Sequence, residues 1–311
     1  MKLSFSDLRA FLEKDLSLKI ELPRRVLIVN DDGPESPYTY PLADVLRSSG
    51  ADVYTVLPYL ERSAYSHSVS VYSPVRLHVR DERNYLAEGT PVDCVKIAVK
   101  HLFKDLKFDA VISGPNSGYN MGRNIVYSGT VAGALEASFW GFPSFALSFP
   151  SSSRLSKFFA SMREKGYGKD DFLSPFEVVR RLREFFGVFY SLSLHVRNRL
   201  NECGPDGTSF FVNVNFPLKF FLKGHSEGDF KIFFSRPGKA WFREWYEERE
   251  DPQGRKFLWL AGEEVEDDTE GVDSWAVSSG MISVSFLNEN FSYMDADDFL
   301  SEFRRKAINL R

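Results

Sequence analysis

The sequence predicts an α/β fold built on a mostly parallel sheet. Short apolar, β-branched runs bounded by turn residues are typical of strands buried on both faces, as in a parallel sheet. Segments with helical spacing and recognisable caps lie between these runs. Strands that alternate with helices indicate βαβ units and therefore parallel neighbours. The 311 residues are enough for one large α/β domain or two smaller ones.

Local patterns place the individual elements. Apolar residues recur at helical spacing from Phe5 to Leu16, and Ser4 can cap that helix together with Asp7. Residues 69–79 alternate as a hairpin or edge strand would. The other expected strands are residues 26–29, 52–57, 109–112, 143–149, 210–216 and 281–286, and the other expected helices are residues 40–48, 91–103, 174–200, 295–310 and one that opens at 128.

The chain divides into three parts by composition. Residues 1–23 are a helical extension, and residues 24–218 carry the alternating pattern of the core. Within that core, residues 150–173 are Ser-rich and then mixed in charge without a clear period, so they are expected to be an insertion. Residues 219–311 begin with short aromatic runs separated by charges, which predict a protruding β region up to residue 260 and then the terminal helix.

Composition excludes several classes of protein. The net charge of -4 and the pI near 5.8 provide no general positive field for a nucleic-acid duplex or an anionic membrane. The two cysteines belong to no CxxC or Cys/His cluster, which argues against a disulfide framework or a zinc site. No apolar run approaches the roughly 18 residues of a membrane span. We therefore expect a cytoplasmic protein.

The first strand ends in an unusual group of polar residues, Asn30-Asp31-Asp32-Gly33. In open α/β sheets, ligands bind in the crevice at the carboxyl ends of the strands. One acid there could cap the next helix, but two adjacent carboxylates repel each other unless a cation or a shared proton lies between them. This pair predicts a metal site.

Two other loops leave the same edge of the sheet, one with Ser63 and His67 and one with Ser113, Asn116 and Asn120. Carboxylate, hydroxyl and amide oxygens are hard ligands that suit Mg²⁺, Mn²⁺ or Ca²⁺. The helix start at Ser128-Gly129-Thr130 offers free backbone N–H groups, which favour a phosphate. A divalent ion beside a phosphate seat is typical of phosphoryl transfer or phosphate hydrolysis.

Each of these residues also has an ordinary structural interpretation. Ser63 alone is a loop serine, and Asn116 among glycines is equally suited to a left-handed turn. Ser128-Gly129-Thr130 could be only a helix cap, and His67 is as well explained by a structural loop histidine as by a phosphate or base contact.

Six motifs, in order along the chain, resemble those of the SurE family of metal-dependent nucleoside monophosphate phosphatases. They are Asn30-Asp31-Asp32-Gly33, Arg62-Ser63-Ala64 with Ser66-His67-Ser68, Gly89-Thr90-Pro91-Val92-Asp93-Cys94, Ser113-Gly114-Pro115-Asn116-Ser117-Gly118, Tyr127-Ser128-Gly129-Thr130-Val131 and Val212-Asn213-Val214-Asn215. The resemblance covers most of residues 24–150 and resumes near residue 210, with a weaker echo through residues 273–287.

The resemblance implies a Rossmann-like three-layer core and a protruding C-terminal region that exchanges between subunits of a homodimer or homotetramer. It also implies a 5′-nucleotidase that uses one divalent ion, and Mg²⁺ or Mn²⁺ is expected in preference to Ca²⁺. The implied metal ligands are Asp31, Asp32, Ser63 and Asn116, with Asp31 and Asp32 as the catalytic pair, and the implied phosphate pocket contains Asn30, Ser128, Gly129 and Thr130.

The turn after the acids departs from the family pattern. The family has a Gly-Ile-x-Ala-Pro-Gly-Ile type of turn, whereas this chain has Gly33-Pro34-Glu35-Ser36-Pro37-Tyr38-Thr39. We expect Tyr38 to alter the entrance of the site and to affect substrate preference more than metal binding. Two alternatives follow: a nucleotide-binding or assembly protein without turnover, and an aspartyl-phosphate phosphatase, although the usual Asp-x-Asp spacing is absent.

Overall fold

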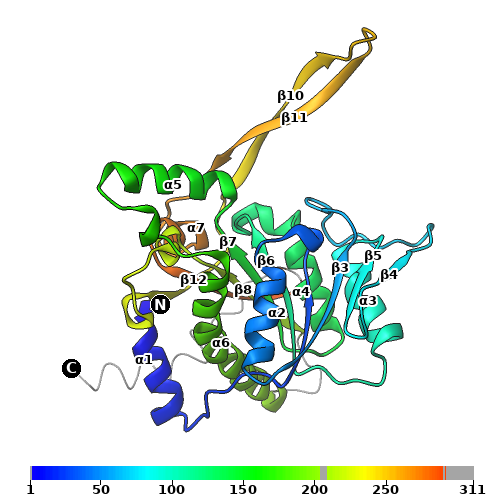
Figure 1. Ribbon diagram of the computed structural model, residues 1–311. Coiled ribbons are helices and arrows are strands. Elements are labelled where there is room, and N and C mark those ends of the chain that lie inside the picture. The colour runs from blue at the N-terminus through cyan, green and yellow to red at the C-terminus, as the bar shows by residue number, and fades with distance from the viewer. Residues whose placement is uncertain (1, 204–208, 290, 292–311) are drawn as a thin grey trace.

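A large, mostly parallel sheet with helices on both faces forms the body of the molecule (Figure 1). Within the residues that the computed structural model describes, 2–203, 209–289 and 291, this sheet has ten strands in the order β1-β9-β12-β8-β7-β6-β2-β3-β5-β4. The predicted α/β class is therefore confirmed. None of the described helices combines the length and the apolar character that crossing a bilayer requires.

The central strands run parallel to one another. They are β2 (Arg25–Val29), β3 (Asp52–Pro58), β5 (Asn84–Ala87), β6 (Ala110–Ser117), β7 (Ser144–Phe149) and β8 (Phe210–Asn215). The helices that connect or follow them are α2 (Thr39–Ser48), α3 (Pro91–Ile97), α4 (Gly129–Phe139) and α6 (Pro175–Cys203). The predicted cap of α3 is present, since Thr90 Oγ1 accepts a hydrogen bond from Asp93 N–H at 3.1 Å and Asp93 accepts one from Thr90 N–H at 2.9 Å.

Alternate residues of β2 point into different layers of the core. Val26 and Ile28 pack with Leu42 and Leu46 of α2, on the face that α6 also covers. Leu27 and Val29 pack on the opposite face with Cys94 and its neighbours in α3. A strand buried on both faces has no polar side, which explains its continuous apolar run.

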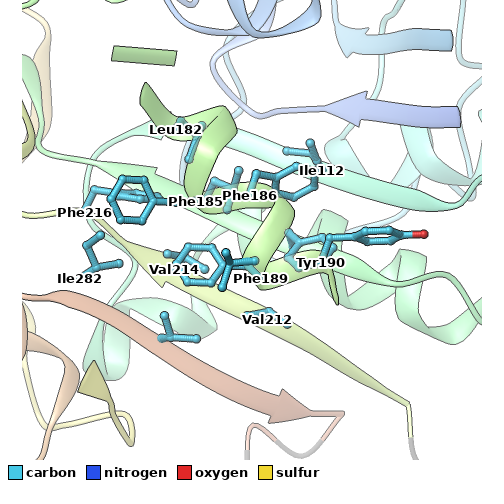
Figure 2. Close-up of a cluster of buried hydrophobic side chains, with 14 of the residues drawn as sticks. Ile112, Leu182, Phe185, Phe186, Phe189, Tyr190, Val212, Val214, Phe216 and Ile282 are labelled. Atoms are coloured by element: carbon cyan, nitrogen blue, oxygen red, sulfur yellow. The ribbon is translucent and has the colours of Figure 1, made fainter. Parts of the chain in front are cut away.

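The main core is rich in phenylalanine. Figure 2 shows Phe185, Phe186 and Phe189 of α6 above strand residues that include Val212 and Val214. The unusual aromatic content of the sequence is therefore partly explained by the thickness of this layer.

Both ends of the described chain add strands to the same sheet. β12 (Ile282–Asn288) pairs antiparallel with β8, β9 (Lys231–Phe234) pairs parallel with β12, and β1 (Lys2–Ser4) pairs antiparallel with β9. The prediction that residues 219–260 protrude was wrong for β9, because Ile232 and Phe234 are buried in the core. The short helix α7 (Asp273–Ser278) precedes β12, and the predicted helix 295–310 lies outside the described residues.

A two-stranded hairpin does project from the body (Figure 1). It consists of β10 (Trp241–Glu250) and β11 (Lys256–Val265). The hairpin's strands pair with each other and lie outside the ten-stranded sheet, so the protruding β region is confirmed for this segment.

The N-terminal extension and the insertion both contain helices. α1 (Phe5–Ala10) continues into a wider helical turn over residues 11–15, and Ser4 Oγ caps it by accepting from Asp7 N–H at 3.0 Å. The insertion contains α5 (Ser152–Glu164), which lies near the foot of the hairpin (Figure 1). Of the expected edge element 69–79, only its end is a strand, β4 (Leu77–Val79), paired antiparallel with β5.

The Tyr38 ring lies in the core beside the site: burial raises the pKa of Tyr38 to about 12, and the charge of Asp32 adds to this shift. The Tyr38 side chain is 5% exposed and its ring packs edge-on against Phe149, with centroids 4.9 Å apart. Phe221 completes this contact at 6.4 Å. A tyrosine ring can be buried among apolar side chains, so Tyr38 of the altered turn fills part of the core. The expected effect of Tyr38 on substrate preference stays a prediction.

The aromatic cluster around Phe149 predicts a large effect on stability. Phe149 is fully buried and also contacts Phe216, Phe220 and Phe221. Phe149→Ala leaves a cavity and should lower the free energy of unfolding by about 3–5 kcal/mol. Phe176→Ala is the control, since Phe176 is 50% exposed, and it should change that energy by no more than about 0.5 kcal/mol. Urea unfolding of both variants measures the difference, and equal effects would contradict the packing described.

Candidate active site

The candidate site lies where the order of the sheet reverses. From β2 the chain proceeds through β3 and β5 on one side, and β6 then pairs with β2 on the other side. Such a switch point opens a crevice at the carboxyl ends of the two strands. Asp31 and Asp32 follow β2, and Asn116 lies at the end of β6, so the fold brings together two of the predicted loops.

Asp31 is held by the amino end of α4. Its Oδ1 accepts a hydrogen bond from Thr130 Oγ1 at 2.6 Å, and its Oδ2 accepts one from Thr130 N–H at 3.1 Å. The first N–H groups of a helix have no partner inside the helix and carry a partial positive charge, so they stabilise a carboxylate. Burial nevertheless raises the pKa of Asp31, with Thr130 opposing the shift.

Close approach of Asp31 to the helix requires a glycine at position 129. A Cβ on Gly129 would lie 2.9 Å from Asp31 Cβ, 3.0 Å from Asp31 Oδ2 and 3.2 Å from Pro91 Cγ. Ser128 caps the helix through a hydrogen bond from Val131 N–H to its Oγ at 3.0 Å. Within one turn, the motif Ser128-Gly129-Thr130 thus caps the helix and binds the carboxylate of Asp31.

Asp32 faces the loop that follows β6. Its Oδ2 accepts a hydrogen bond from Ser117 N–H at 3.2 Å, which places Asn116 and Ser117 beside the acid pair. Burial raises the pKa of Asp32 to about 7, and the charge of Asp31 adds to the effect. A partly buried acid beside a second acid is a strong candidate for cation binding, because a cation offsets both the cost of burying the charge and the repulsion between the two carboxylates.

The loop with Ser63 is also fixed to this corner. Arg62 N–H donates to the backbone oxygen of Asp31 at 2.7 Å, and Ser63 Oγ donates to Glu61 Oε1 at 2.7 Å. The negative charge of Glu61 contributes to the raised pKa of both Asp31 and Asp32. Sequence reasoning missed Glu61, because an acid in a polar loop carries no signal of its own.

Asn116 and Asn30 differ in how their side chains are used. Asn116 Nδ2 donates to Gly118 O at 2.8 Å, and its Oδ1 accepts no hydrogen bond from the described residues. Asn30 is fully buried and holds the turn after β2: its Nδ2 donates to Gly33 O at 2.7 Å and to Thr39 Oγ1 at 3.0 Å, and its Oδ1 accepts from Gly33 N–H at 3.1 Å.

Two buried clamps hold the loop after β6. Asn215 Oδ1 accepts from Asn120 N–H at 2.9 Å, while Asn213 Nδ2 and Asn215 Nδ2 donate to Asn120 O at 2.9 and 3.1 Å. Asp273 accepts from Gly122 N–H at 2.8 Å and from Gly238 N–H at 3.0 Å, and its burial raises its pKa to about 6. The Val212-Asn213-Val214-Asn215 motif therefore positions a loop instead of reaching the crevice itself.

His67 packs against α4. Its Nε2 lies 3.2 Å from Glu136 Oε2, and the same buried carboxylate binds Lys96 Nζ at 2.7 Å and Trp140 Nε1 at 2.8 Å. The hydrogen bonds of these partners lower the pKa of Glu136 against the effect of burial. The structural interpretation of His67 is favoured, since this contact fastens the loop 61–68 to α4.

The donor set suits a hard cation. Among the described residues, no three His, Cys, Asp or Glu side chains are arranged to hold a metal ion, so a site made only of these types is absent there. Asp31, Asp32, Ser63 and Asn116 instead combine two carboxylates with a hydroxyl and an amide oxygen, as Mg²⁺ and Mn²⁺ prefer.

The raised pKa of Asp32 predicts a pH-dependent cost to stability in chelator. The folded state holds the proton more tightly than the unfolded state, so stability should fall as pH rises from about 4 to about 7 and then level off. Asp32→Asn removes this cost and should stabilise the protein above pH 7 by up to about 4 kcal/mol, at 1.4 kcal/mol for each pH unit by which the pKa is raised.

Urea unfolding at pH 5 and pH 8 measures this effect, with Asp44→Asn, an exposed acid on α2, as the control. An Asp32→Asn protein no more stable than the unaltered chain at pH 8 would contradict the raised pKa of Asp32.

Comparison with known proteins agrees with this geometry. The family model described as "Survival protein SurE" matches residues 26–240. The 5'-nucleotidase SurE of Caldanaerobacter subterraneus subsp. tengcongensis is 33% identical over 284 residues, which cover 90% of this chain and 97% of the relative. The 5'-nucleotidase SurE of Paramagnetospirillum magneticum is 34% identical over 274 residues, which cover 87% and 92%.

A solved structure shares the fold. The crystal structure of the SurE protein from Aquifex aeolicus is 28% identical, has a TM-score of 0.55, and covers 89% of this chain and 97% of that one. The family model spans more than half of the chain, and both relatives are more than 30% identical over most of it. The chain therefore belongs to the SurE family.

Proposed function

We propose that this protein is a divalent-metal-dependent phosphatase that hydrolyses nucleoside 5′-monophosphates to nucleoside and phosphate. The observation that carries the proposal is the adjacent pair of buried Asp31 and partly buried Asp32 at the switch point of the sheet, where burial and the charge of Asp31 raise the pKa of Asp32 to about 7. The name 5'-nucleotidase of the curated relatives supports the substrate class.

Asp31, Asp32, Ser63 and Asn116 would hold the ion. The carboxyl of Asp31 is oriented by Thr130, that of Asp32 by Ser117 N–H, and Asn116 Oδ1 is not engaged with the described residues. Ser63 would exchange its hydrogen bond with Glu61 for the ion. When bound, Mg²⁺ or Mn²⁺ supplies Lewis-acid polarisation of a phosphoryl oxygen and a more acidic bound water.

The phosphate would lie against the start of α4. Thr130 N–H and Oγ1 are engaged with Asp31, and Ser128 Oγ with Val131 N–H, so these residues would shape the pocket by holding the turn. Gly129 N–H donates to none of the described residues and would be the donor that reaches the phosphate. Asn30 would act through the turn that it holds from Asp31 to Gly33.

A phosphate-release screen tests the proposal. The purified protein is dialysed against chelator and assayed on nucleoside 5′-monophosphates with Mg²⁺, Mn²⁺ or Ca²⁺ added singly. Release should depend on metal, and Asp32→Asn should lower kcat/KM at least 100-fold, since it removes a ligand charge while keeping the shape. Asp44→Asn should leave kcat/KM within twofold, because Asp44 is exposed on α2.

Two results would contradict the mechanism. Full phosphate release in excess chelator, or full activity of Asp32→Asn, would show that the reaction does not depend on this metal site. Nucleotide binding without metal-stimulated release would favour the alternative of a binding or assembly protein.

We further propose that the hairpin β10–β11 mediates a homodimer or homotetramer. Both of its faces carry exposed apolar side chains among charged ones. Those of Trp241, Trp245, Phe257 and Trp259 lie on one face and those of Phe242, Tyr246, Leu258 and Leu260 on the other, and each of these eight is at least 37% exposed. A two-stranded hairpin is marginally stable alone, and a large exposed apolar patch is typical of an interface.

Disruption of one face should change the oligomeric state. Tyr246→Glu combined with Leu258→Glu places two charges on the same face of the hairpin, and should convert the assembly to a smaller species by light scattering. Glu250→Gln, an exposed change on the same strand, should leave the mass unchanged. A monomeric unaltered protein would contradict this proposal.

A further inference from the structure

A second hollow lies farther along the same edge of the sheet. It encloses about 360 Å³, which is within the range of roughly 300–1,000 Å³ that small-molecule sites occupy. Part of its wall comes from the segments that follow three parallel strands: Tyr119 and Met121 after β6, Arg154 and Phe158 on α5 after β7, and Leu218 after β8. Glu266 beyond β11 and Val277 of α7 line the other side. The hollow therefore opens from the carboxyl edge, where Asp31 and Asp32 also lie.

The hollow is close to the acid pair. Ser117 N–H donates to Asp32, and Tyr119 follows two residues later. Two residues of extended chain span at most about 7 Å, so the backbone of Tyr119, whose side chain lines the hollow, lies close to the loop that contacts Asp32. A substrate whose phosphate lies at the acid pair can thus extend into the hollow.

The charged side chains around the hollow are already paired. Arg154 forms ion pairs with Glu264 and Glu266, and its guanidinium lies over the Tyr119 ring at 5.3 Å from the centroid. Lys219 Nζ is directed to Asp229 O at 3.4 Å and lies over the Phe230 ring. With Glu266 itself in the wall, a second phosphate gains little here, and a neutral group is favoured.

Flat and apolar surfaces line the remainder. Phe158 and Arg154 are four residues apart on α5 and so lie on the same side of that helix, and Leu218 also lines the hollow. The Tyr119 hydroxyl is buried and forms no hydrogen bond with the described residues. An unpaired buried hydroxyl destabilises the fold, and a polar atom of a ligand could pair with it after a small shift of the neighbouring side chains. A heteroaromatic ring has flat apolar faces and polar atoms at its edge, so it matches these walls.

We propose that this hollow receives the nucleobase of the substrate and that α5 forms its outer wall. The inference rests on the proposed function, since it assigns the base of the same nucleotide. The phosphate binds at the acid pair, the sugar spans the loop 117–119, and the base stacks against Phe158. The insertion 150–173 is then the part of this chain that provides preference for nucleotides over smaller phosphomonoesters.

The test compares two substrates and two variants. The ratio of kcat/KM for adenosine 5′-monophosphate to kcat/KM for ribose 5-phosphate, which lacks a base, reports the contribution of the hollow. Phe158→Ala should lower this ratio about 5- to 100-fold, as expected for loss of base stacking on an aromatic ring. Phe158→Tyr keeps the ring and should restore the ratio, while Phe176→Ala, an exposed phenylalanine on α6, should not lower it. An unchanged ratio in Phe158→Ala would overturn the proposal.

A binding measurement separates this inference from the proposed function. Calorimetry with adenosine and with cytidine requires no phosphate chemistry, and Phe158→Ala should weaken the binding that the unaltered protein shows. If the protein binds a nucleoside in this way but releases no phosphate, the enzymatic proposal fails and the base site stands. If it hydrolyses both phosphomonoesters equally and binds neither nucleoside, the base site fails and the phosphatase stands.

Discussion

The pair of hydrogen bonds from the start of helix α4 to Asp31 is the interaction on which the rest of the site depends. Thr130 supplies both a backbone N–H and a hydroxyl to one carboxylate, and the absence of a side chain at Gly129 allows the close approach. A buried carboxylate without such donors would be neutral or expelled. With them, a strand end and a helix start are joined across about 100 residues of sequence, and Asp32 is held beside a second charge.

The surrounding contacts serve to keep three loops at that corner. Arg62 N–H fastens the loop of Ser63 to Asp31, and Glu136 binds the same loop through His67. Asn213, Asn215 and Asp273 hold the loop after β6 by its backbone. Because Glu136, Asn213, Asn215 and Asp273 are buried, their contacts fix the loops more rigidly than exposed contacts would, and precise placement is what metal ligation and catalysis require.

Much of the fold was predictable because its signals are local. Apolar runs, the Thr90 and Asp93 capping box and the alternation of elements all act over a few residues, and the structure has them where they were expected. The assignment of β9 failed because its place in the sheet depends on pairing with β12 and β1, which no local pattern encodes. The burial of the Tyr38 ring was missed for a related reason: whether a ring turns inward depends on Phe149 and Phe221, far away in the chain.

The candidate site shows the same division. Asp31, Asp32 and Asn116 were predicted from strand ends, whereas Glu61 and Glu136 gain their importance from contacts between distant segments. The most direct test of the account is calorimetric titration of the chelator-treated protein with Mn²⁺ at pH 6 in buffers of different ionisation enthalpy. With the pKa of Asp32 raised to about 7, metal binding should release about one proton from this carboxyl, and Asp32→Asn should bind weakly and release fewer protons. Tight binding without proton release, or no binding by the unaltered protein, would contradict the paired-acid metal site.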